Sequence, residues 1–182
     1  MDKSSSNFYE SFCQSYISSI KKINFKKIDE LTLLLLELKK NKGRLFVAGV
    51  GGSSANASHL VNDFRKLTNI ESYSVSENVS ELTARINDDG WEQSYVDYLK
   101  VSNFNKNDIV LILSVGGGSI EKKISMNLVR VIEYANKIKA KSVSIVSNLG
   151  GFAKLHCDLS ILIYVDDKKL ITPVSESIQS FI

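Results

Sequence analysis

The chain has 182 residues, of which 43% are apolar and 24% charged, with two cysteines and a formal net charge of +3. These values exclude a disordered chain, a collagen and a disulfide-dense scaffold, and they predict one folded domain that buries its own core. The positive charge comes from scattered lysines without interleaved aromatic residues, which argues against a nucleic-acid partner.

Two helices are predicted before any strand. Apolar side chains recur at helical spacing from Phe8 to Ile20, and again from Ile28 to Leu38. Together these helices carry more apolar surface than the edge of one small sheet can cover. We therefore interpret residues 1–42 as a helical extension through which subunits associate.

Residues 43–182 are predicted to form one structural unit in which strands alternate with helices. A strand over 44–48 ends in the turn GVGGSS at 49–54, and a helix follows. A strand over 109–113 ends in the turn SVGGGS at 114–119, and a helix is predicted over 120–137. Further strands are predicted at 72–76, 142–147 and 159–165. Buried strands that alternate with helices indicate an α/β fold with a doubly wound parallel sheet.

The two glycine turns indicate a phosphate site. In a parallel sheet they follow the carboxyl ends of strands, where helix N-termini expose unpaired N–H groups. Glycine lets the backbone approach an anion closely, and serine hydroxyls add hydrogen bonds. The residues predicted to hold a phosphorylated small molecule are Gly51, Gly52, Ser53, Ser54, Ser114 and Ser119. The alternative is that these are ordinary strand-to-helix turns in which glycine only caps and packs.

No nucleotide is expected at these turns. The dinucleotide-binding fingerprint requires a third glycine at the position of Ser54, and the phosphate-binding P-loop requires a Gly-Lys-Ser/Thr sequence that is absent.

His59 and Asp63 lie four residues apart in the helix that follows the first turn. This spacing places both side chains on one helix face, which suits a metal-binding pair or an acid–base pair. The alternative is a surface or core pair without a chemical role.

The segment GVGGSSANASH at 49–59 closely resembles the G-x-G-[GT]-S-x-x-x-A-x-H signature of phosphoheptose isomerases, within the sugar isomerase (SIS) domain family. Asn87-Asp88, the turn at 114–119 and Gly150-Gly151 agree with further family segments in the same order. The resemblance covers nearly the whole chain. It implies a flavodoxin-like SIS fold and a homotetramer with active sites between subunits.

The resemblance also implies an activity. Members of the family convert sedoheptulose 7-phosphate into D-glycero-D-manno-heptose 7-phosphate, an early step towards the heptose of bacterial lipopolysaccharide or capsule, and commonly carry zinc. Such an aldose–ketose isomerisation requires a base beside a carbonyl, a group that polarises the carbonyl and an anchor for the phosphate. By resemblance, Asn87 and Asp88 would bind sugar hydroxyls, and His59 would be a zinc ligand.

The chain departs from the family pattern at three places. Asp63 stands where the family has glutamate as base and ligand, so its carboxylate is withdrawn by about 1.5 Å. The turn at 114–119 lacks two hydroxyls of the family's loop. Glu176 stands at the place of a glutamine ligand, and the family's histidine eight residues later would fall beyond Ile182, so we expect the final helix to continue in the natural protein.

The predicted active site takes these three departures into account. Asp63 and Glu176 are the candidate catalytic groups, and His59, Asp63 and Glu176 are the candidate metal ligands. One imidazole and two carboxylates would admit zinc or a harder divalent ion. The alternative for Glu176 is a carboxylate on a helix face without a role.

Two functions therefore remain open from the sequence. The first is an isomerase of sedoheptulose 7-phosphate. The second is a non-catalytic SIS module that binds a sugar phosphate or a protein, as relatives that associate with a replication initiator do. The shortened carboxylate and the absent histidine favour the second, whereas His59, Asp63, Glu176 and Asn87-Asp88 together favour the first.

The two cysteines, Cys13 and Cys157, are far apart in sequence and favour a reducing compartment, so we expect a cytoplasmic protein. The first six residues lack the apolar core of a signal peptide. The longest apolar run, residues 33–36, is too short to cross a bilayer, so no membrane role is expected.

Overall fold

The computed structural model describes the backbone of residues 3–182 and the side chains from Asn7 onward. Met1 and Asp2, which open the predicted extension, lie outside the described residues. In chain order the elements are α1 (Lys3–Lys21), α2 (Phe25–Lys40), β1 (Leu45–Gly49), α3 (Gly52–Asp63), the π-helical turn η1 (Phe64–Thr68), β2 (Ser72–Ser74), α4 (Val79–Asp89), α5 (Ser94–Val101), β3 (Ile109–Ser114), α6 (Met126–Ile138), β4 (Lys141–Ser147), α7 (Gly151–His156), β5 (Leu159–Ile163) and α8 (Ile171–Gln179).

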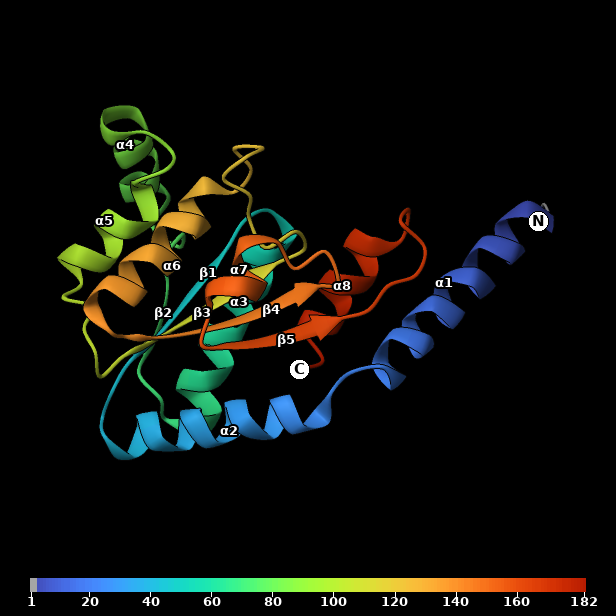
Figure 1. Cartoon of the computed structure of the whole chain (residues 1–182), viewed down its shortest axis with the longest axis horizontal. Coiled ribbons are helices and arrows are strands. Elements are labelled where there is room, and N and C mark those ends of the chain that lie inside the picture. The colour runs from blue at the N-terminus through green and yellow to red at the C-terminus, as the bar shows by residue number, and fades with distance from the viewer. Residues whose placement is uncertain (1–2) are drawn as a thin grey trace.

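The sheet has five parallel strands in the order β2-β1-β3-β4-β5 (Figure 1). Every residue of β1 and of β3 is buried, as expected for central strands covered on both faces. These two strands are neighbours, and Gly49 at the end of β1 lies opposite Leu113 near the end of β3. The predicted parallel α/β sheet is thereby confirmed.

Helices cover both faces of the sheet. Since side chains along a strand alternate between the two faces, each strand contributes residues to two cores. On one face, Val47 and Leu111 belong to a core that includes buried residues of α2, α3 and α8. On the other face, Phe46 and Ile112 pack in a second core with α5, α6 and α7. The domain is therefore doubly wound, as predicted.

The helix predicted over 120–137 is wrong at its beginning, because α6 starts only at Met126. Ser119 and Ile124 instead exchange backbone hydrogen bonds of 2.9 and 3.0 Å across a separate turn. Lys123 and Ser125 have positive φ angles of 52° and 48°, a left-handed conformation that interrupts a helix. Ile124, which lies within the predicted helix, is exposed. Ser119 consequently does not lie at a helix N-terminus.

Two helices between β2 and β3 went unpredicted. Asn78 caps α4 by accepting a hydrogen bond of 3.2 Å from the Glu81 backbone N–H. α5 packs Tyr95 and Leu99 into the core of the second sheet face. The predicted strand at 72–76 is confirmed in a shorter form, as Ser72–Ser74.

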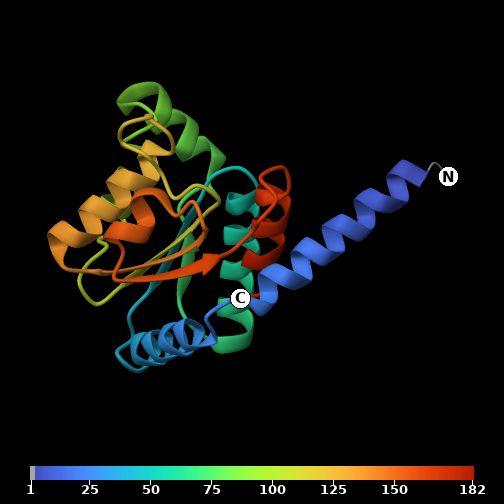
Figure 2. The same ribbon diagram turned by 45° about the vertical axis from the view of Figure 1, so that its right-hand side comes forward.

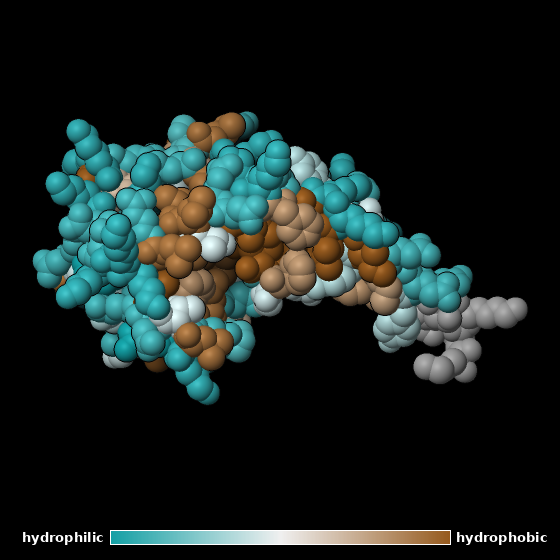
Figure 3. Space-filling view, turned by 90° about the horizontal axis from the view of Figure 1, so that it is seen from below, coloured by the Kyte–Doolittle hydropathy of each residue, from teal (hydrophilic) through white to brown (hydrophobic). Residues whose placement is uncertain are grey.

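α1 projects from the body of the domain as an arm (Figures 1 and 2). Phe12, Tyr16 and Ile20 lie along the side of α1 that packs against the core, whereas Phe8 and Ile17 are exposed. Seen from below, apolar side chains gather across the body and continue onto this arm (Figure 3). The apolar surface that motivated the predicted extension is therefore present, and the role of that extension in subunit association stays a prediction.

The two cysteines are free thiols. Cys13 is exposed on α1, whereas burial raises the pKa of the Cys157 thiol to about 11. Cys157 is therefore protonated and unreactive at neutral pH. None of the helices within residues 3–182 is both long and apolar enough to cross a bilayer.

Candidate functional site

The two glycine turns lie side by side at the point where the chain changes from one sheet face to the other. β1 leads into α3 on the first face and β3 leads towards α6 on the second, while the two strands pair directly. In sheets with this strand order, ligands bind in the crevice at that switch point. The structure therefore places both turns where the sequence predicted a phosphate site.

The first turn is built for close backbone approach. Gly51 has a φ angle of +65°, and its carbonyl accepts from the Ser54 and Ala55 amides at 3.0 and 3.3 Å. Ser53 is buried, and the Ser54 hydroxyl lies 2.6 Å from that of Ser76, in the turn that follows β2. Both predicted serines are thus already packed or hydrogen-bonded within the protein.

Glu176 of α8 lies against the beginning of α3. A Cβ atom added to Gly52 would overlap the Glu176 carboxylate, so the missing side chain of Gly52 makes room for this contact. The positive end of the α3 helix dipole favours a negative group here. The first turn therefore already holds an anionic side chain of the protein itself.

The second turn keeps backbone donors open. The Ser114 hydroxyl accepts from the Gly117 amide at 3.0 Å, and Gly117 and Gly118 have positive φ angles of 72° and 82°. Within residues 3–182, the amides of Gly116 and Gly118 donate to no protein acceptor. The O–H of Ser114 also remains available as a donor. This turn is therefore the more open anion site of the two.

The second turn is held in place by the Gly150-Gly151 segment at the beginning of α7. The amides of Phe152 and Ala153 donate to the carbonyls of Gly118 and Gly117 at 2.8 and 2.9 Å. Gly151 has a φ angle of +52°, and a Cβ atom there would overlap the carbonyl oxygens of Gly116 and Gly118. Two glycine-rich segments thus pack backbone against backbone.

His59 and Asp63 meet on α3 as the sequence predicted. His59 Nε2 lies 3.4 Å from Asp63 Oδ2, and the side chains are 72% and 44% exposed. Both line a cavity of about 230 Å³ between α3 and the end of α8, together with Gln179. The pair is therefore open to a ligand and faces a second wall that carries both polar and apolar side chains, Gln179, Ser180, Phe181 and Ile182.

Glu176 does not join this pair. α8 runs beside α3 in the same direction, because Glu176 contacts Gly52 while Ser180 donates to Asn56 Oδ1 at 3.0 Å. Gly52 and His59 are separated by seven residues of helix, or about 10 Å. In the described part of the chain, no three His, Cys, Asp or Glu side chains form a group suited to a metal ion. The predicted set of His59, Asp63 and Glu176 is thus not assembled within one chain.

Asn56 and Gln179 were not predicted as site residues. Asn56 Nδ2 donates to the Glu176 carbonyl at 2.8 Å and to Gln179 Oε1 at 3.1 Å, which joins α3 to α8. Both polar side chains lie at an interface between two amphipathic helices. A polar residue on the buried face of an otherwise apolar helix pattern is the signal that would have revealed Gln179.

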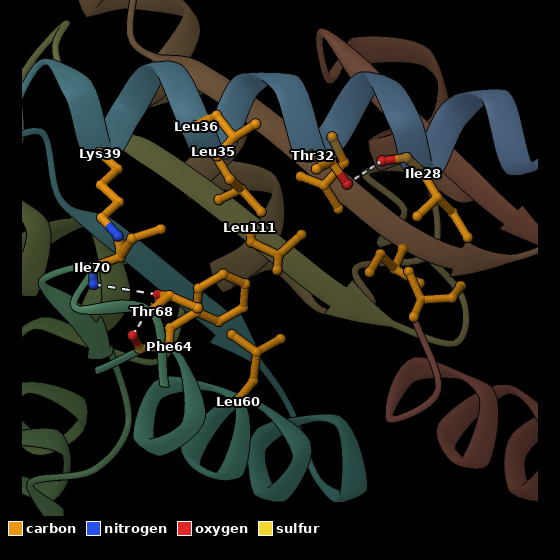
Figure 4. A pocket seen from close by; sticks show the side chains of 13 residues that line it. Ile28, Thr32, Leu35, Leu36, Lys39, Leu60, Phe64, Thr68, Ile70 and Leu111 are labelled. Carbon is orange, nitrogen blue, oxygen red and sulfur yellow. Dashed lines mark hydrogen bonds between the residues drawn. The ribbon is translucent and has the colours of Figure 1, made fainter. Parts of the chain in front are cut away.

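An apolar groove adjoins the cavity (Figure 4). It measures about 300 Å³ and runs between α2 and α3, with Leu111 and Ile145 of the sheet among its lining residues. Leu60, Phe64 and Ile182 line both the groove and the cavity beside His59. The candidate site therefore has a polar end and an apolar continuation.

The predicted sugar-binding pair lies near the end of α4. Asn87 and Asp88 are exposed on α4, where Asn87 Nδ2 donates to Asp88 Oδ1 at 2.8 Å. No hydrogen bond or ion pair among residues 3–182 joins them to either glycine turn. Their predicted role in the same subunit therefore gains no support from these contacts.

Comparison with known proteins gives a family and a set of relatives. Residues 8–147 match the SIS domain family. The phosphoheptose isomerase of Helicobacter pylori is 27% identical over 139 residues, which cover 74% of this chain and 69% of that protein. That of Nitratiruptor sp. is 29% identical over 137 residues, or 72% of this chain and 70% of that protein. The family match ends before α8, so it does not extend to Glu176 or Gln179.

Solved structures show the same fold. The phosphoheptose isomerase of Neisseria gonorrhoeae superposes with a TM-score of 0.82 at 18% identity, covering 98% of this chain and 92% of that one. The phosphoheptose isomerase of Francisella tularensis gives a TM-score of 0.80 at 20% identity, covering 98% and 93%.

Proposed function

The chain belongs to the SIS domain family, and from that premise we propose that it is an aldose–ketose isomerase that converts sedoheptulose 7-phosphate into D-glycero-D-manno-heptose 7-phosphate. The curated relatives that it resembles are named phosphoheptose isomerases. The observation that carries the proposal is the arrangement of an open glycine turn at the sheet's switch point and an exposed His59–Asp63 pair on the adjacent helix.

The phosphate is proposed to bind at the second turn. Gly116 and Gly118 offer free amides there, and Ser114 and Ser119 offer hydroxyl protons. Glu176 at the first turn would repel a dianion, so Gly51, Gly52, Ser53 and Ser54 shape the crevice rather than hold the full charge.

The chemistry is proposed to take place at His59 and Asp63. Asp63 removes a proton from C1 of the ketose while His59 donates one to the C2 carbonyl oxygen, which gives an enediol. His59 then takes the proton of the O1 hydroxyl, and Asp63, whose carboxyl proton exchanges with solvent, returns a proton to C2, so the aldose forms without net gain or loss of atoms. Proton transfer by a positioned side chain typically contributes about 10²- to 10⁴-fold in rate.

Zinc, which the resemblance implies, stays a prediction. Within the described residues, one chain provides the His59–Asp63 pair but no third ligand beside it. These residues alone do not fit a zinc site, and the proton transfers above use no metal.

The test is turnover by the purified chain. We expect conversion of sedoheptulose 7-phosphate into the aldose, followed by NMR, with and without a chelator and added zinc. Binding of the sugar phosphate without conversion under any of these conditions would contradict the enzyme and support the alternative of a non-catalytic SIS module. If the chain neither bound nor converted sedoheptulose 7-phosphate, the proposal of this sugar phosphate as its substrate would be wrong.

We further propose that the protein is a homotetramer with active sites between subunits. The exposed apolar side chains of α1 and α2 support this, among them Phe8, Ile17, Phe25, Leu33 and Leu36. Sedimentation velocity should give the mass of four chains at micromolar concentration, and Leu33→Lys should lower it because a charge would enter the interface. A monomeric wild-type chain at that concentration would contradict the proposal. A cytoplasmic location and a role in lipopolysaccharide or capsule synthesis stay predictions.

A further inference from the structure

A short loop, residues 119–124, stands between the second glycine turn and the beginning of α6 (Figure 1). Ser119 and Ile124 close its base by exchanging backbone hydrogen bonds of 2.9 and 3.0 Å. Within the loop, the amide of Lys122 donates to Ser119 Oγ at 3.2 Å. The loop is therefore an ordered turn, in which the backbone of Lys122 is held beside the Ser119 hydroxyl.

The base of the loop packs against the second glycine turn. A Cβ atom added to Gly118 would lie 3.5 Å from the carbonyl oxygen of Ser125 and 3.7 Å from that of Ile124. Gly118 is buried, and within residues 3–182 its amide donates to no protein acceptor. A buried N–H without an acceptor is unfavourable, and native proteins retain few of them. This amide therefore points to an acceptor that a ligand supplies beside the loop.

The second turn offers donors to a phosphate but no positive charge of its own, because its amides and hydroxyls are neutral. Glu176 places a negative charge at the neighbouring first turn. The loop carries Lys122 and Lys123 against one acid, Glu121, so its net charge is +1. All three side chains are exposed, and none of them forms a hydrogen bond or ion pair with another described side chain. The loop therefore holds a cation that the chain itself does not neutralise.

Lys122 is the lysine placed closest to the donors of the turn. Its backbone nitrogen lies 3.2 Å from Ser119 Oγ, whereas the Lys123 amide donates to the carbonyl of Ile120 within the loop. A phosphate oxygen that accepts from the Ser119 hydroxyl would lie about 2.7 Å from Oγ, and so no more than about 6 Å from the Lys122 nitrogen. The flexible four-carbon stem of a lysine spans that distance.

We propose that the ammonium group of Lys122 pairs with the phosphate of the sugar substrate at the second glycine turn. The inference rests on the proposed isomerase function and deepens it, because it names the residue that gives this turn its preference for a dianion. The turn lacks two hydroxyls of the family's loop. A charge-assisted hydrogen bond is roughly twice as strong as a neutral one, so one lysine offsets that loss.

The expected result for Lys122→Gln is a KM for sedoheptulose 7-phosphate that is about 5- to 10-fold higher, with little change in kcat. The dissociation constant of inorganic phosphate, measured by calorimetry, should rise by a similar factor. Both differences should shrink at high salt, which screens exposed charges. The thermal midpoint should be unchanged, because the Lys122 amide that holds the loop is retained. A merely structural Lys122 would show the reverse, a lower midpoint and unchanged binding.

Two further variants make the result specific to this position. Glu121→Gln removes the acid of the same loop, so it should lower both the KM and the dissociation constant of phosphate. Lys106→Gln makes the same change of charge at an exposed position before β3, at the opposite edge of the sheet, and should alter neither. Equal effects of Lys106→Gln and Lys122→Gln would overturn the pairing, and so would weaker phosphate binding in Glu121→Gln.

The outcomes separate this inference from the proposed function. A wild-type chain that converts the sugar phosphate, with a Lys122→Gln variant of equal KM, would overturn the role of Lys122 alone. A wild-type chain that binds inorganic phosphate without any conversion would contradict the isomerase, and weaker phosphate binding in Lys122→Gln would still support the pairing. A wild-type chain that neither converts the sugar nor binds phosphate would overturn both.

Discussion

Replacing Asp63 by asparagine is expected to lower kcat by about 10²- to 10⁴-fold, because the amide cannot accept the proton taken from the substrate carbon. Asp63 is 44% exposed, and its protein contacts are a hydrogen bond of 3.0 Å from Asn62 and the approach to His59. The thermal midpoint should therefore stay within a few degrees of wild type. Steady-state kinetics and a melting curve on the same preparation measure both quantities.

Two further variants make this result specific. Asp29→Asn makes the same change at an exposed position of α2, and it should leave kcat unchanged. Asp63→Glu extends the carboxylate by about 1.5 Å towards the place that the family's glutamate occupies, and it should retain or raise kcat. Equal turnover in wild type and Asp63→Asn would exclude Asp63 as the base.

Replacing Gly151 by alanine is expected to disrupt the second glycine turn. The new Cβ would overlap the carbonyl oxygens of Gly116 and Gly118, and a φ angle of +52° is itself unfavourable for alanine. Together these effects should lower the free energy of unfolding by about 2–4 kcal/mol. The midpoint should fall by roughly 5–15 °C, and the affinity for the sugar phosphate should fall with it.

Gly116→Ala is the matched control in the same turn. A Cβ atom at Gly116 meets nothing within 4 Å. This variant should therefore melt within about 1–2 °C of wild type, since a change that meets no neighbour costs little. If Gly116→Ala and Gly151→Ala melted alike, packing between the turn and α7 would not be what holds the turn.

The sheet could be predicted from sequence because its strands are buried on both faces. Uninterrupted apolar runs such as 109–113 distinguish central parallel strands from the periodic helices around them. The two glycine turns could then be predicted from their positions in the sequence, because each comes directly after such an apolar run. The pair of His59 and Asp63 followed from helical spacing alone.

The helix predicted over 120–137 was too long at its beginning. The spacing of apolar residues predicts a helix without any information on backbone conformation. Ile120 and Ile124 continue the apolar period of α6, yet both side chains are exposed. The left-handed residues Lys123 and Ser125 separate the turn from the helix, and nothing in their side chains requires that conformation. Tertiary packing therefore decided where α6 begins.

The position of Glu176 could not be predicted because it depends on how two helices align. Glu176 lies on α8, and the register of α8 against α3 places it at Gly52, about two helical turns from His59. The same register brings Gln179 to the cavity. Sequence spacing within one helix cannot fix the alignment of one helix against another.

The most direct measurement is the reaction of sedoheptulose 7-phosphate with this chain in deuterium oxide, followed by NMR of the product. Isomerisation through proton transfer at a carboxylate predicts an aldose that carries deuterium at C2. No aldose, or an aldose whose C2 carries only the hydrogen that the substrate brought, would contradict the account.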